Sequence, residues 1–363
     1  MPLGLYLHLP FCRVHCTYCP FAISTDLSLQ DAYTAALLAE IDSRAGGLAD
    51  TLYLGGGTPS RMSLPNLTAI LERVRSRFTI APEAEVTIEA NPEDISEETL
   101  REWRALGINR VSIGVQSFHD AELLPLGRVH GATRAREAVA LAVREGLRTS
   151  LDLILGLPNQ TVASFRETLQ TAIALGVGHI SLYMLDLEEG TPLAVQVARG
   201  RTALPEEDDV AELYLGAVST LAAAGLQQYE ISNFAKAGDE SRHNLRYWRR
   251  EPYHGLGLGA HSFLDERRFA NTRDIRRYIA DPLAARDFEE ELGEAEQRRE
   301  VIFLRLRQAS GIDYADLVRL AGQEGIAWIE RGLTDGWLRR EGARVAFTAS
   351  GFLLSNELIS QLF

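Results

Sequence analysis

The chain has 363 residues, of which 46% are hydrophobic and 24% are charged. This balance is typical of a globular protein and excludes disordered, collagen-like and coiled-coil chains. Acidic residues outnumber basic residues by 50 to 37, and the formal net charge of −13 disfavours a protein whose main partner is a nucleic acid. No run of about 18 apolar residues and no secretion signal occur, so we expect a cytoplasmic protein.

Strand-like and helix-like segments alternate through the first two thirds of the chain. Such alternation is typical of a parallel sheet whose strands are connected by helices. Polar or glycine-rich segments follow five of the predicted strands, and in barrel-like α/β folds these strand ends carry the functional site. We therefore predict an α/β fold with a partial (βα)6 TIM-like barrel; a doubly wound sheet is the alternative. The predicted strands are 5–9, 51–54, 85–89, 110–115, 150–155 and 179–185, and the predicted helices are about 31–44, 65–78, 96–106, 132–146, 161–176 and 207–225.

The pattern changes near residue 230. We expect residues 1–232 to form the partial barrel and residues 233–295 to form a connecting segment of loops and short elements laid over it. Residues 296–363 combine two or three helices with a strand-like 338–346 region and a helix over 351–362, which is typical of a winged-helix-like domain. Its nine Arg, no Lys and nine Asp or Glu give no positive excess, which favours a structural or docking role over DNA binding.

The three cysteines of the chain lie within eight consecutive positions, directly after the first predicted strand. Cys12, Cys16 and Cys19 form a C-x3-C-x2-C motif, and an odd number of thiols this close together is not a disulfide framework. A structural zinc site would need a fourth ligand, such as His8 or His15. An iron–sulfur cubane normally takes four thiolates, so three would leave one iron open to an outside ligand.

This motif, after the first strand of a partial barrel, resembles the radical S-adenosylmethionine superfamily. In that superfamily the cofactor chelates the open iron, and an electron from the cluster cleaves its sulfonium to a 5′-deoxyadenosyl radical. The resemblance implies a [4Fe–4S] cluster on Cys12, Cys16 and Cys19, bound S-adenosylmethionine and an electron donor for the cluster. The segment 55–59, GGGTP, lacks the lysine and spacing of a Walker loop and resembles the glycine motif that binds the methionyl amino group.

Further motifs narrow the resemblance. Segments 6–12, 55–59, 89–92, 114–118 and 152–158 together are similar to the oxygen-independent coproporphyrinogen III oxidase group, which also has a helical C-terminal domain. By position, the S-adenosylmethionine contacts of that group fall on Tyr6, Gly56, Gly57, Thr58, Glu89, Gln116, Arg128 and Asp152.

Two departures from the true oxidase point to a related family. The oxidase has a further cysteine where this chain has Phe21, and it has a long N-terminal extension ahead of its cluster motif. In both respects the chain resembles the HemW-type heme chaperones. This implies binding of heme and its transfer to an acceptor hemoprotein. In one version of the hypothesis the acceptor lies at the membrane. The alternatives are oxidative decarboxylation of coproporphyrinogen III to protoporphyrinogen IX and, more weakly, a zinc-binding interaction protein.

His243 is the predicted heme residue. Segment 243–248, HNLRYW, preceded by 229–234, is similar to the heme-binding signature of that family. An imidazole with neighbouring aromatic rings is suited to axial ligation and ring stacking. The alternative is a lid loop in which His243 only forms hydrogen bonds.

Other polar side chains receive simpler interpretations. Arginines within 246–250 are suited to heme propionates or to a membrane surface, although a solvated loop is the more common explanation. We expect His8 to be a core or supporting group, His15 to be solvated and His261 to have a packing role. A homodimer linked by heme is compatible with these interpretations.

Overall fold

The computed structural model describes residues 2–362. At its centre is a sheet in which β1 to β6 are parallel and lie side by side in chain order. This order confirms the partial (βα)6 barrel, and the doubly wound alternative is wrong because such a sheet reverses its strand order. The six strands are β1 (Leu3–Leu9), β2 (Leu48–Gly56), β3 (Thr79–Ala90), β4 (Arg110–Gln116), β5 (Arg148–Leu155) and β6 (His179–Met184).

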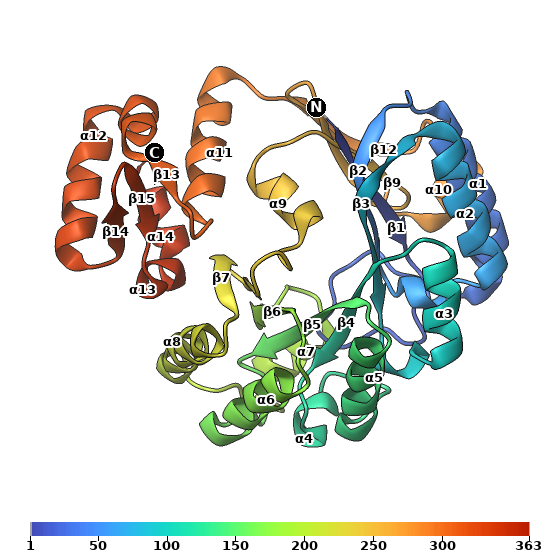
Figure 1. Cartoon of the computed structure of the whole chain (residues 1–363), viewed down its shortest axis with the longest axis horizontal. Coiled ribbons are helices and arrows are strands. Elements are labelled where there is room, and N and C mark those ends of the chain that lie inside the picture. The colour runs from blue at the N-terminus through green and yellow to red at the C-terminus, as the bar shows by residue number, and fades with distance from the viewer. Residues whose placement is uncertain (1, 363) are drawn as a thin grey trace.

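Helices cover the outer face of this sheet (Figure 1). Alternation along β1 shows why: Leu5, Leu7 and Leu9 are fully buried in the hydrophobic core, whereas Tyr6 between them stacks on other rings inside the barrel. The outer and connecting helices are α1 (Gln30–Ser43), α2 (Leu64–Arg77), α3 (Glu97–Ala105), α4 (Asp120–Leu123), α5 (Ala132–Arg144), α6 (Val162–Ala174), α7 (Pro192–Ala198) and α8 (Glu207–Ala223).

The segment after residue 232 extends both edges of the sheet. Strand β8 pairs antiparallel with β6, and β9 pairs parallel with β1 and is followed by an antiparallel meander. The expected short elements are present, but they continue the sheet and do not lie over the barrel as loops. The strands are too short to show a clear period in the sequence. Strand β7 (Gln227–Glu230) ends just before this segment and pairs with β8. The elements of the segment are β8 (Asn233–Ala235), α9 (Arg242–Trp248), β9 (Tyr253–Leu256), β10 (His261–Leu264), β11 (Arg267–Asn271), α10 (Ile275–Ala280) and β12 (Arg286–Glu291).

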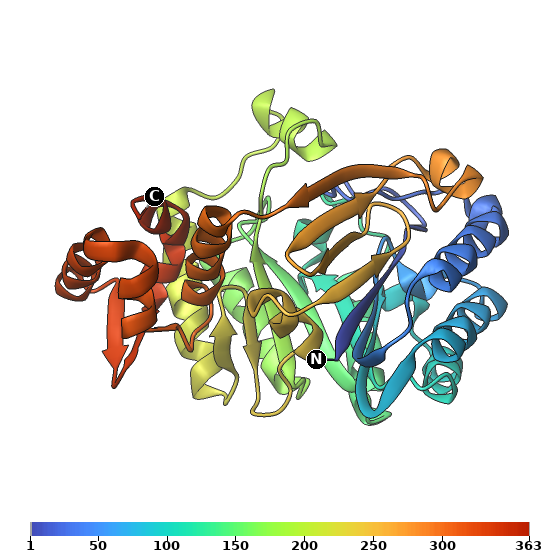
Figure 2. The same ribbon diagram turned by 90° about the horizontal axis from the view of Figure 1, so that it is seen from above.

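The C-terminal region packs beside the β7 edge of the sheet (Figures 1 and 2). Backbone hydrogen bonds from Ile231 to Arg307 and from Ala309 to Tyr229, both 3.0 Å, join the two parts. The expected single helix over 351–362 is two helices, because Leu354 leaves the helical conformation between them. The elements are α11 (Glu294–Leu306), β13 (Ile312–Asp313), α12 (Tyr314–Asp335), β14 (Leu338–Glu341), β15 (Arg344–Phe347), α13 (Ala349–Leu353) and α14 (Ser355–Ser360).

This region has its own apolar centre and a small sheet with the strand order β13-β15-β14. Trp328 and Trp337 pack edge to face, with their ring centroids 4.6 Å apart. Helix α12 is interrupted at Gly322, whose φ of 69° lies outside the helical range. Across residues 2–362, no helix combines the length and the apolar composition needed to cross a membrane.

Candidate functional site

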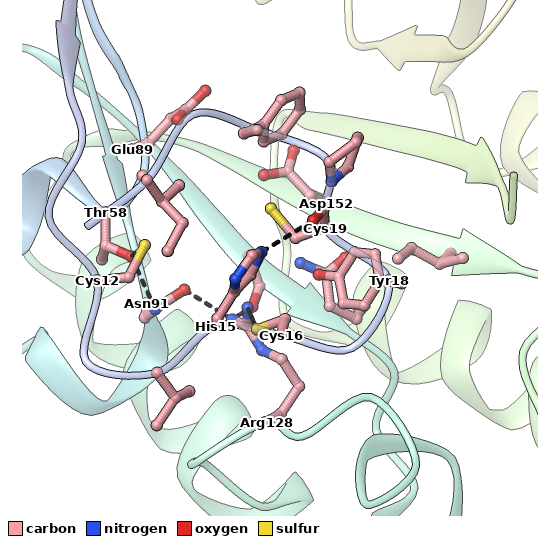
Figure 3. Close-up of a pocket in the computed structure, with 18 of the residues that line it drawn as sticks. Cys12, His15, Cys16, Tyr18, Cys19, Thr58, Glu89, Asn91, Arg128 and Asp152 are labelled. Atoms are coloured by element: carbon pink, nitrogen blue, oxygen red, sulfur yellow. Dashed lines mark hydrogen bonds between the residues drawn. The ribbon is translucent and has the colours of Figure 1, made fainter. Parts of the chain in front are cut away.

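A cavity of about 430 Å³ opens at the carboxyl ends of the barrel strands (Figure 3). Its walls come from the loop after β1 and from segments at the ends of β2 to β6. The structure thus brings together side chains that are widely separated in the sequence. Ten of the predicted site residues line this cavity: Cys12, Cys16, Cys19, Gly56, Gly57, Thr58, Glu89, Gln116, Arg128 and Asp152.

The three thiols belong to one loop that faces the cavity (Figure 3). Thr58 Oγ1 donates to the sulfur of Cys12 at 3.3 Å, and Arg128 Nη1 donates to the sulfur of Cys16 at 3.6 Å. Nearby donors and positive charge favour the thiolate, which is the form that ligates metals. Burial nevertheless raises the pKa of Cys12 to about 11, against the effect of the Thr58 hydrogen bond. Binding of iron must therefore displace a proton from this thiol.

This donor set fits an iron–sulfur cluster. Within residues 2–362, no three His, Cys, Asp or Glu side chains approach closely enough to enclose a single metal ion. A [4Fe–4S] cluster takes its thiolates at separate irons, and three free thiols on one loop beside the cavity suit such a cluster. Cys12, Cys16 and Cys19 would hold three irons and leave the fourth without a cysteine ligand from this chain.

Two glycines let the chain approach the cluster loop closely. Gly56 has a φ of +116°, and a Cβ there would lie 2.7 Å from the ring of His8. A Cβ on Gly57 would lie 2.5 Å from the backbone of Pro10 and 3.0 Å from the sulfur of Cys12. Any side chain at these positions would push the β2 end away from the cysteine loop, so the segment fits the cofactor cradle predicted for it.

Two carboxylates face the cavity. Burial raises the pKa of Glu89 to about 7; a hydrogen bond from Tyr53 lowers it, the charge of Asp152 raises it, and a bond from the Gly56 amide lowers it. The two donors lie 2.8 Å and 3.0 Å from the Glu89 oxygens. Burial also raises the pKa of Asp152 to about 6, although Ser181 and Ser112 donate to it. Buried carboxyl groups that are costly to ionise are suited to a positively charged ligand, which would stabilise their charge.

Arg128 is held in place by a residue that the sequence analysis did not select. Its Nη2 donates to Asn91 Oδ1 at 2.6 Å and to the Gly114 carbonyl at 2.7 Å, and Asn91 also donates to Thr58 Oγ1 at 3.3 Å. The available signal was the position of Asn91 directly after β3. Gln116 adopts a left-handed φ of 66°, a strained conformation that is typical of functional sites.

Tyr6 and His243 do not line the cavity. The rings of Tyr6, Tyr53 and His243 stack inside the barrel, with centroids 6.1 Å apart for Tyr6 and Tyr53 and 5.2 Å apart for Tyr53 and His243. The hydroxyl of Tyr53 reaches Glu89, so this stack lies directly behind the cavity wall. The contact of Tyr6 with S-adenosylmethionine stays a prediction.

His243 is only 2% exposed, and both of its ring nitrogens have partners. Nδ1 lies 2.8 Å from Thr51 Oγ1, and Nε2 lies 2.7 Å from the hydroxyl of Tyr247. Burial lowers the pKa of His243 to about 3, and the charge of Arg246 acts in the same direction. Ligation of heme by this neutral imidazole stays a prediction, and it requires α9 to move.

Two of the three arginines within 246–250 are not part of a solvated loop, which the sequence had suggested for all of them, whereas Arg249 is exposed. Arg246 is 3% exposed and pairs with Asp50, while Arg250 Nε donates to Glu300 at 2.5 Å. These side chains fasten α9 to the start of β2 and to the C-terminal region, which leaves neither free for propionates or lipid in this conformation.

The remaining histidines follow the expected pattern only in part. His8 is buried, its Nε2 donates to the Ala22 carbonyl at 2.8 Å, and its ring packs against Gly56, as expected of a core group. His15 is exposed, but its Nε2 lies 3.0 Å from the Cys19 carbonyl. His261 is exposed at the start of β10 and packs against Phe288.

Comparison with known proteins agrees with this geometry. The family model of the radical SAM superfamily matches residues 6–172. The solved structure of coproporphyrinogen III oxidase (HemN) from Escherichia coli, a radical SAM enzyme, has a TM-score of 0.85 and 24% identity, and the match covers 99% of this chain and 90% of that chain. The barrel and its three-cysteine cavity therefore define a radical SAM protein.

Full-length relatives give the family. The heme chaperone HemW of Mycobacterium tuberculosis is 38% identical, with 99% of this chain and 95% of the relative covered. HemW of Bacillus subtilis is 35% identical, with 97% of each chain covered. The chain belongs to the HemW heme chaperone family.

Proposed function

We propose that this protein binds heme and transfers it to an acceptor hemoprotein. The observation that carries the proposal is the similarity to HemW heme chaperones, which extends over 99% of the chain. The cavity supports it, because ten of the residues predicted to hold the cluster and S-adenosylmethionine line it together. His243 is the residue for which a heme contact is predicted from the sequence.

The residues of the chain have distinct tasks in this proposal. Cys12, Cys16 and Cys19 would hold a [4Fe–4S] cluster, which when bound supplies an electron to S-adenosylmethionine. Gly56 and Gly57 admit the ligand close to the backbone, and Glu89 and Asp152 offer negative charge to its cationic groups. Arg128 supplies the positive charge next to the cluster loop.

The competing activity is decarboxylation of coproporphyrinogen III. It is tested by anaerobic incubation of the cluster-loaded protein with S-adenosylmethionine, a reductant and coproporphyrinogen III, followed by chromatography of the tetrapyrroles. We expect no decarboxylated product and, in a parallel titration, binding of heme to the same preparation. Formation of protoporphyrinogen IX would make the protein an oxidase and overturn the proposal.

The proposal includes three further elements. A cytoplasmic electron donor reduces the cluster, the acceptor is reached at the membrane surface, and heme links two copies into a dimer. Sedimentation with and without heme tests the dimer, and flotation with anionic vesicles tests the membrane contact. A monomer in both heme states, or no flotation, would remove the corresponding element.

A further inference from the structure

An apolar rim surrounds the mouth of the cavity. It consists of five large side chains that are all exposed, although such residues usually gather in the core: Val14, Phe21, Val129, Tyr183 and Met184. They come from three separate parts of the chain, namely the cluster loop, the segment after α4 and the end of β6. Exposed apolar groups that collect around one opening are typical of a binding surface.

The interior of the cavity is needed for the cofactors. Its 430 Å³ lies toward the small end of the range of about 300–1,000 Å³ for pockets that hold one drug-sized ligand. A cluster and S-adenosylmethionine at the residues described above would occupy most of that space. A tetrapyrrole that reaches this site must therefore lie across the mouth, on the apolar rim.

The rim also carries a soft ligand for iron. Met184 is 41% exposed at the end of β6, whereas Met62 is buried in the core. A thioether is an established axial ligand of heme iron, to which its sulfur donates an electron pair without any redox change. An exposed methionine beside an exposed tyrosine is suited to a flat apolar ligand that carries iron.

Charge at the mouth gives heme one preferred orientation. Arg13 lines the mouth and forms no hydrogen bond or ion pair with the described residues. Asp186 and Glu188 lie on the side of Met184. The propionates would therefore turn toward Arg13 and solvent, away from these two carboxylates.

A second cavity does not suit this ligand. It lies between the start of β9 and the C-terminal region, and most of its lining residues are charged, among them Arg250, Arg305 and Arg344. His243 is also unsuited in this conformation, because it is buried and both ring nitrogens are engaged. The apolar rim combines an exposed apolar surface with an iron ligand at the cavity itself, whereas the exposed pair of His261 and Phe288 does not line it.

We infer that heme binds across the mouth of the cavity, with its ring on the apolar rim and the sulfur of Met184 on its iron. This inference rests on the proposed function, since it names the site at which the cargo is held. Cargo held at a rim, with one edge in solvent, can leave without opening of the barrel, which is what a carrier requires.

The test uses cluster-loaded protein titrated separately with ferric heme and with metal-free protoporphyrin IX. Met184→Leu keeps the apolar contact and removes the sulfur. We expect it to abolish the near-infrared charge-transfer band of thioether-ligated ferric heme and to leave protoporphyrin binding within about twofold. Phe21→Ala should weaken binding of both tetrapyrroles about tenfold, because it removes an aromatic contact common to both.

Leu124→Ala is the matched control. Leu124 is 80% exposed but does not line the cavity, so its loss should change neither titration. Iron and sulfide content of every variant, with its circular dichroism spectrum, checks that the cluster and fold are retained. The His243→Ala variant should keep the thioether band.

The outcomes separate the inference from the proposed function. A thioether band that persists in Met184→Leu, or that disappears in His243→Ala alone, would overturn the site at the rim and leave heme binding intact. If the unsubstituted protein binds neither protoporphyrin nor heme at any concentration tested, the proposed function itself fails.

Discussion

The raised pKa of Glu89 predicts how the affinity for S-adenosylmethionine depends on pH. Burial sets this pKa at about 7, so the carboxyl group is largely protonated below that value. A sulfonium ligand favours the carboxylate, and binding below the pKa must therefore release a proton. Affinity should be highest above pH 7 and should fall as the pH is lowered.

The magnitude follows from the protonation equilibrium. Between about pH 8 and about pH 6 the ionised fraction of Glu89 falls about tenfold, which weakens binding by the same factor. Asp152, with a pKa of about 6, adds about a factor of two at the acidic end. The raised pKa of Glu89 has the opposite effect on the free energy of unfolding of the protein without this ligand. Because the folded pKa lies above the unfolded value, that stability falls as the pH rises from about 4.3 to about 7.

Equilibrium dialysis of the ligand against cluster-loaded protein measures this dependence. Titration of the ligand itself is common to all variants, so the comparison with Glu89→Gln isolates the contribution of the carboxylate. We expect the variant to bind S-adenosylmethionine more weakly at about pH 8. It should also lack the change in affinity of about tenfold between about pH 8 and about pH 6. An unchanged slope in Glu89→Gln, or affinity that rises on acidification, would refute the argument.

Three further predictions concern the cluster loop and the barrel. Cys16→Ser should abolish cluster assembly, and full retention of the brown chromophore and sulfide in that variant would remove Cys16 from the ligands. Gly57→Ala should cost about 1–3 kcal/mol in denaturant unfolding and lower the iron content, since its Cβ would meet the Pro10 backbone. Glu40→Ala should cost about 3–5 kcal/mol, because Glu40 is fully buried and accepts from Tyr278 at 2.6 Å and from the Gly257 amide at 2.8 Å. Unfolding midpoints within error of the unsubstituted protein would contradict the last two.

The barrel strands could be predicted because they are apolar and, for five of the six, a polar or glycine-rich segment follows. Strands such as β9 and β10 could not, since four residues show no reliable period and their pairing with β1 or with each other depends on distant parts of the chain. The break at Leu354 likewise has no glycine or proline to mark it.

The cavity residues were predictable for a related reason. Strand ends converge by topology alone, so motifs at those ends had to meet, and the cysteine spacing indicated a cluster. The surroundings of His243 could not be predicted in this way, because its partner Thr51 is 192 positions away in the sequence. Only the folded chain brings the two side chains together. Side-chain direction along β1 similarly places Tyr6 within the aromatic stack.

Tyr53 connects the cavity wall to the buried His243. Its hydroxyl holds Glu89 in the cavity wall, while its ring rests on that of His243. Removal of the imidazole would take support from a ring that positions a cofactor carboxylate. If a His243 variant fails to deliver heme, there are thus two distinct explanations. Either the predicted contact of His243 with heme is lost, or the cofactor pocket is disturbed. Affinity for S-adenosylmethionine in the same variant tells them apart, since only the second explanation weakens it.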